Sequence, residues 1–69
     1  MGRYLVNLSS FPIEQREKLY DRLNDYLDHV YFTPQIGVFD VIWDSNDMTI
    51  EKFLGVTSEY ITLLHQWNN

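Results

Sequence analysis

The 69 residues of this sequence include no cysteine. Disulfide cross-links, thiol catalysis and zinc–thiolate sites are therefore excluded, and the composition is compatible with a reducing compartment. No apolar run approaches the roughly 18 residues that a membrane-spanning helix needs. The first residues, Met1-Gly2-Arg3-Tyr4, reach polar side chains before a signal-peptide core can form. We therefore expect a cytoplasmic protein that does not bind membranes.

Basic residues are scarce, since five Lys and Arg stand against ten Asp and Glu, giving a net charge of −5. Binding to DNA or RNA depends on cations that neutralise phosphates, so this balance argues against direct nucleic-acid binding. Aromatic residues are abundant, at 16% of the chain. Without neighbouring cations, we expect them to pack in the core or at a protein interface instead of stacking on bases.

The sequence also lacks any recognisable catalytic or metal-binding motif. His29 and His65 are isolated and form no HxH or HExxH pattern. Residues 44–47, Asp-Ser-Asn-Asp, resemble the start of a calcium loop, but its sixth position would be Thr49 instead of glycine. We therefore expect no catalytic, cofactor-binding or metal-binding residues and no enzyme. The enzymatic alternative requires a cleft in which Asp40 reaches His29 or His65.

The length predicts one small α+β domain spanning residues 1–69. Alternating apolar residues predict a strand from Arg3 to Ser9. Apolar residues at helical spacing predict a helix over the stretch from Ile13 to Val30, ending near Asp28 or His29. Residues Val30–Phe32 favour a short strand. Residues Val38–Trp43 predict a strand that is apolar on both faces and hence centrally placed.

A second helix is expected to begin at Asp47 or Thr49 and to continue through Trp67, with Gly55 interrupting it. Residues 59–64 have β character, so a fourth strand there is the alternative, although the 3.6-residue spacing favours helix. The expected order is β-α-β-β-α, with two helices on one face of a three-stranded sheet. This is a ferredoxin-like arrangement without its last strand, or with it if residues 59–64 form the fourth strand.

Two charged residues fall among apolar neighbours. Asp40 lies within the central strand, where it has three alternatives: it faces solvent on an uncovered sheet face, pairs with Arg3 on a neighbouring strand, or lies at an interface. Arg16 falls on the apolar side of the first helix, so it either extends to the rim or pairs with an acid of a partner.

The first helix also carries an ordered set of acids, which we call the acidic row. It consists of Glu14, Glu17, Asp21, Asp25 and Asp28, spaced three or four residues apart. At a rise of about 1.5 Å per residue the row is roughly 20 Å long. Such a row is usually a solvated helix face, but like charges at this spacing repel one another, and acids near the C-terminal end oppose the helix dipole. Pairs with Lys18 and Arg22 are expected to offset part of this repulsion.

The acidic row is the surface feature with no structural need, so we expect it to bind a partner, with Trp67 as an aromatic anchor. A protein with a basic surface, such as one that handles nucleic acid, fits best, with the row acting as a nucleic-acid mimic that inhibits it. Inhibitors of phage and mobile-element type often have this size and charge. The alternative is a homo-oligomeric structural domain, and a homodimer is expected because a small sheet leaves apolar surface or an edge exposed.

Overall fold

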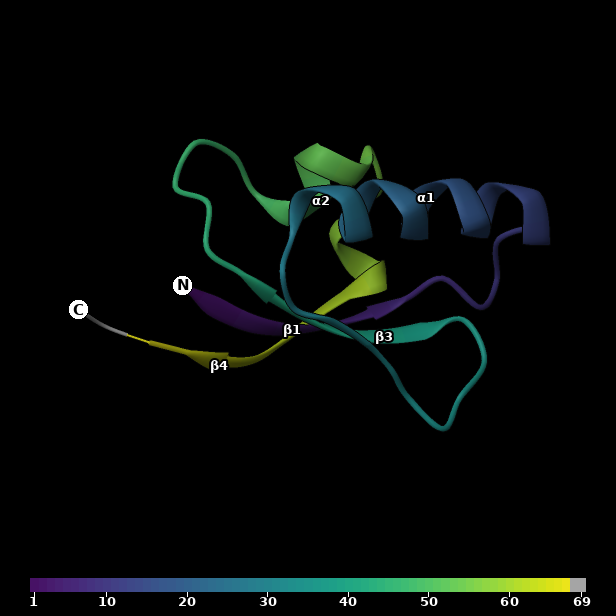
Figure 1. Ribbon diagram of the computed structural model, residues 1–69, viewed down its shortest axis with the longest axis horizontal. Coiled ribbons are helices and arrows are strands. Elements are labelled where there is room, and N and C mark those ends of the chain that lie inside the picture. Colours follow the sequence, from purple (N-terminus) through teal and green to yellow (C-terminus); the bar gives the residue numbers. More distant parts are fainter. Residues whose placement is uncertain (68–69) are drawn as a thin grey trace.

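The computed structural model describes residues 1–67 and contains a four-stranded antiparallel sheet with both helices on one face (Figure 1). The elements in chain order are β1 (Gly2–Asn7), α1 (Ile13–Tyr26), β2 (Val30–Phe32), β3 (Val38–Trp43), α2 (Ile50–Leu54), the 3₁₀ helix η1 (Ser58–Tyr60) and β4 (Ile61–Gln66). No helix within the described residues has the length and hydropathy needed to cross a membrane.

The strand order β2-β3-β1-β4 makes both helices crossover connections. β1 and β2 are each antiparallel to β3, so they run parallel to one another, and α1 joins them. In the same way β3 and β4 are each antiparallel to β1, and α2 joins them. Two crossovers are thus interleaved in a single sheet.

The core lies between the sheet and the two helices. Alternate residues of β1 and β3 face it, and each of the two helices contributes two buried apolar residues. The buried apolar residues of the core are Val6, Leu8, Leu19, Leu23, Leu27, Phe39, Val41, Trp43, Ile50 and Leu54. Because this cluster joins every layer, its burial supplies the main apolar contribution to stability.

The prediction of a three-stranded sheet and of a second helix through Trp67 is wrong. Helix α2 ends at Leu54 because Gly55 adopts the left-handed conformation (φ 72°). Its N–H donates to the Glu51 carbonyl at 2.8 Å, and the Val56 N–H donates to the same oxygen at 3.1 Å. This turn closes the helix and redirects the chain. The alternative of a strand near residues 59–64 is confirmed, since β4 pairs with β1.

The boundaries of the other elements follow the predictions with shifts. Residues Val38–Trp43 form β3 as predicted, whereas β1 ends at Asn7. Helix α1 stops at Tyr26, short of the predicted end, and Leu27 is already extended. The last turn carries no basic residue to complement the helix dipole, and Val30 pairs with β3 instead. At the other end, Ile13 is 64% exposed, so it is not part of the apolar face.

Arg16 has a different role from either predicted one. Its guanidinium donates to the carbonyls of Leu8, Ser9 and Phe11, at 3.2, 3.0 and 3.1 Å. It thereby fixes the loop between β1 and α1. Gly37 (φ 84°) lies against the same loop, where a Cβ atom would come within 2.9 Å of the Ser9 Cα.

The two ends of the described chain lie together (Figure 1). The carbonyl of Met1 accepts hydrogen bonds from the Trp67 N–H at 3.0 Å and from Gln66 Nε2 at 2.8 Å. These bonds extend the pairing of β1 with β4 to the last described residue.

Candidate protein-binding surface

The acidic row lies on the side of α1 that faces away from the sheet. Its members are all exposed, while Leu19 and Leu23, on the opposite side of the helix, are buried. Because α1 ends at Tyr26, Asp28 lies outside the helix, and the helical part of the row runs from Glu14 to Asp25. At about 1.5 Å per residue this part is roughly 16 Å long.

The predicted ion pairs along the row are absent. Within residues 1–67, the ion pair between Arg3 and Asp40 is the only one with a nitrogen–oxygen distance below 4.0 Å. Arg22 instead donates to the Phe53 carbonyl at 2.5 Å, and its guanidinium lies 5.2 Å from the centre of the Phe53 ring. Arg22 therefore ties α1 to α2, and the carboxylates of the row face solvent without a cation from this chain.

Trp67 is separate from the acidic row. Its side chain is 37% exposed and meets His65 edge-on, with the ring centres 4.7 Å apart. It follows β4, whereas α1 leads into β2 at the opposite edge of the sheet. The two candidate partner-binding features, the row and Trp67, thus belong to different surfaces.

Asp40 pairs with Arg3, which is one of the three predicted alternatives. Arg3 Nε lies 3.0 and 3.1 Å from the two carboxylate oxygens, and a second guanidinium nitrogen also donates. These hydrogen bonds lower the pKa of Asp40; partial burial opposes the shift, and attraction to the Arg3 charge adds to it. The same bonds raise the pKa of Arg3. The pair is a cross-strand contact that stabilises the ionised carboxylate.

Neither histidine hydrogen-bonds to Asp40. His29 Nδ1 lies 2.8 Å from the Tyr31 hydroxyl, and His65 is opposite Arg3 in the pairing of β1 with β4. Asp40, already bound by Arg3, therefore has no imidazole positioned as its acid–base partner. Among the described residues, no group of three or more His, Asp or Glu is arranged to hold a metal ion.

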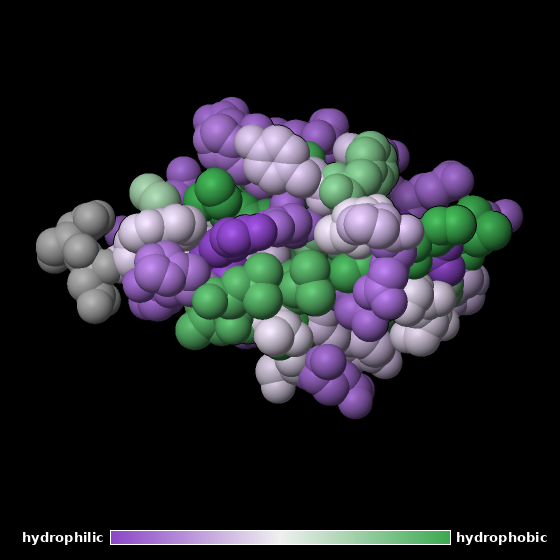
Figure 2. Space-filling view, turned by 90° about the horizontal axis from the view of Figure 1, so that it is seen from below, coloured by the Kyte–Doolittle hydropathy of each residue, from purple (hydrophilic) through white to green (hydrophobic). Residues whose placement is uncertain are grey.

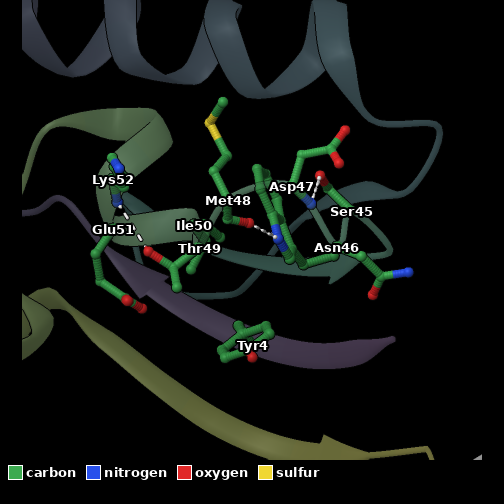
Figure 3. A pocket seen from close by; sticks show the side chains of 10 residues that line it. Tyr4, Ser45, Asn46, Asp47, Met48, Thr49, Ile50, Glu51 and Lys52 are labelled. Atoms are coloured by element: carbon green, nitrogen blue, oxygen red, sulfur yellow. Dashed lines mark hydrogen bonds between the residues drawn. The ribbon is translucent and has the colours of Figure 1, made fainter.

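A hollow beside α2 has a volume of about 510 Å³ (Figure 3). Tyr4, Trp43 and the turn of residues 45–49 line it, together with the start of α2. Two local bonds hold its lining: Trp43 Nε1 donates to the Met48 carbonyl at 3.0 Å, and the Lys52 N–H donates to Thr49 Oγ1 at 3.2 Å. The turn and the helix cap thus shape the hollow, and Thr49, one of the two residues predicted to start the second helix, caps α2.

The sheet face opposite the helices is a second exposed surface. Leu5 on β1 and Ile42 on β3 are half-buried there, on either side of the Arg3–Asp40 pair. Figure 2 looks at this face and shows an apolar band running beside hydrophilic residues. The sequence led us to expect exposed apolar surface or an exposed edge in this small sheet, and β4 completes the surface.

No protein-family model matches the chain, and no curated protein or solved structure is significantly similar to it.

Proposed function

We propose that the chain is a small acidic interaction module, which binds and inhibits a larger protein with a basic surface, such as one that handles nucleic acid. The observation that carries this proposal is the state of the acidic row. Glu14, Glu17, Asp21 and Asp25 are exposed on the outward side of α1, and no Lys, Arg or His within residues 1–67 forms an ion pair with them.

The electrostatics of α1 favour this role over a purely structural one. Acids three or four residues apart repel one another, and Asp25 lies in the last helical turn, where the helix dipole disfavours negative charge. A basic partner removes both penalties on binding. The same charges speed the encounter with such a partner, at a rate that falls as ionic strength rises.

Inhibition follows from the shape of the row. A rigid helix presents carboxylates at intervals of about 5–6 Å, which matches a groove lined with Lys and Arg side chains. A protein that uses this groove for phosphates cannot bind both ligands at once. The row therefore acts as a nucleic-acid mimic, and the module itself needs no contact with nucleic acid.

The alternative function is a homo-oligomeric structural domain without catalytic activity. It is supported by the helix-free sheet face, where Leu5 and Ile42 are only partly covered. For the fold we also propose the ferredoxin-like arrangement. The order β-α-β-β-α-β and the interleaved crossovers support it.

The proposal is tested by reversing charges on and off the row. Asp21→Lys with Asp25→Lys changes the net charge by four units, and so does Asp44→Lys with Asp47→Lys in the exposed turn before α2. We expect proteins captured from a native lysate by the wild-type chain to be kept by the turn variant, lost by the row variant and released by salt. Equal capture by both variants would refute the role of the row.

A further inference from the structure

The two edge strands of the sheet differ in length and chemistry. β2 has three residues and is bordered by Asp28 and Pro34, whereas β4 has six residues. An edge strand leaves a row of backbone N–H and C=O groups unpaired, and natural proteins protect it by making it short or by adding charge or proline. β2 has these protections, whereas β4 has only a single bulge.

β4 has the composition of a strand that is paired on both of its edges. From Tyr60 to Asn69 the sequence contains no Asp, Glu, Lys or Arg and no proline. Leu63 and Leu64 are 52% and 46% exposed. The one irregularity is a bulge at Leu64, because Tyr4 pairs with Leu63 and Arg3 with His65. The bulge leaves the first half of β4, from Ile61 to Leu63, in regular register.

We propose that β4 docks antiparallel against β4 of a second copy of this chain, joining the two sheets into one. A second copy fits this edge because two antiparallel copies of one strand are self-complementary, and the contact closes with two chains. Two chains of net charge −5 repel one another, so they meet most readily where the acids are fewest. β4 is uncharged, and Glu59, the acid nearest to it in sequence, is hydrogen-bonded to Thr57 Oγ1 at 2.9 Å.

The topology also keeps the acidic rows apart in this dimer. α1 leads into β2, at the edge opposite β4, so the rows lie toward the two far ends of the joined sheet. Antiparallel pairing of identical strands places the two-fold axis perpendicular to the sheet, which leaves the helices of both copies on the same side. The surface used for docking does not overlap the acidic row.

The first test measures mass by light scattering between micromolar and millimolar concentrations. We expect the wild-type chain to form a dimer, and Leu64→Lys to raise its dissociation constant at least about tenfold. The substitution makes the net charge less negative, so greater overall repulsion between the two chains cannot explain the loss. Ile36→Lys makes the same charge change at a side chain that is 85% exposed in a loop, and this control should still dimerise. Thermal unfolding checks that both variants fold.

The second test locates the contact and does not depend on a disruptive variant. Because the chain has no cysteine, a variant with the single substitution Thr62→Cys or Leu63→Cys can form a disulfide only with the same residue of a second copy. We expect oxidation to cross-link at least one of these variants efficiently, and Ile42→Cys on the helix-free face to react slowly. Preferential cross-linking through Ile42→Cys would overturn the proposal in favour of face-to-face packing, and so would a wild-type chain that stays monomeric. Neither test reverses charges of the acidic row. The proposed dimer can therefore be refuted while the proposed function stands.

Discussion

The two crossover connections of this sheet are stabilised in different ways. Helix α1 has fourteen residues, yet no side chain caps its start and no basic residue lies in its last turn. Helix α2 has five residues, with Thr49 capping its start and the left-handed Gly55 its end. The long helix is held by packing of Leu19 and Leu23, whereas the short one also needs its caps. Length alone therefore does not show which interactions stabilise a helix.

The largest effect is expected for Leu23→Ala, because this side chain is fully buried between α1 and the sheet. Loss of the packed atoms and the cavity left behind should lower the free energy of unfolding by about 2–5 kcal/mol. Chemical denaturation measures this change, and Ile13→Ala, at an exposed position of the same helix, is the control. If Leu23→Ala lowered the free energy of unfolding less than loss of a cap on α2 does, packing would not be the main interaction that holds α1.

Gly55→Ala should have the next largest effect. Its Cβ would meet no atom within 4 Å, so only the left-handed backbone opposes it, at about 1–2 kcal/mol. Gly55→Asn should cost less, since asparagine tolerates this conformation better. Denaturation gives the order, and circular dichroism shows whether alanine lengthens α2. An alanine variant as stable as the wild type would mean that the left-handed turn is not what ends the helix.

Removing hydroxyl side chains at the starts of the two helices tests directly whether α2 depends on its cap more than α1 does. Thr49→Ala deletes the acceptor for the Lys52 N–H and should cost about 1 kcal/mol. Ser10→Ala, just before α1, removes a hydroxyl that makes no cap bond, so its effect should stay within about 0.5 kcal/mol. Thermal unfolding of the two variants measures the difference. Equal losses would show that α1 depends on a cap after all.

The smallest effect concerns Asp40, which belongs to neither crossover. Its pKa in the folded chain lies below its ordinary value of 3.8, so the ionised carboxylate contributes stability above that pH. This contribution is lost as the pH falls through the lower folded value. Asp40→Asn should therefore lower stability near neutrality, by a small amount because the pair is partly exposed, and it should weaken the pH dependence of unfolding below about pH 4. An unchanged acid transition would exclude the Arg3 pair as its source.

Sequence patterns predicted the elements whose periodicity has one interpretation. Residues 38–43 are apolar on both faces of a strand and form β3, and the leucines of α1 repeat at helical spacing. The segment after Gly55 was ambiguous, because Ile61, Leu64 and Trp67 also fit a helix. What decides it is pairing with β1, a contact between residues nearly 60 positions apart, which local patterns do not contain.

The surface was predictable to a similar extent. The outward position of the acidic row follows from helix geometry, and the structure keeps all of its members exposed. The prediction of an ion pair between Arg22 and the row was wrong because Arg22 donates to the carbonyl of Phe53, which is 31 positions away. The lack of charge in residues 60–69 was visible in the sequence, but it marked a candidate surface only once residues 61–66 were known to form an outer strand.

The hydrogen bonds from Gln66 and Trp67 to the Met1 carbonyl hold the two ends of the described chain next to each other. A short glycine linker joining residues 67 and 1 would close the backbone into a ring, and new ends could then be opened in the exposed turn of residues 44–47. Such a permuted chain should keep every strand pairing, and its new ends should lie away from β4. A permuted chain that failed to fold would show that the order of the two crossovers, and not only their contacts, is needed.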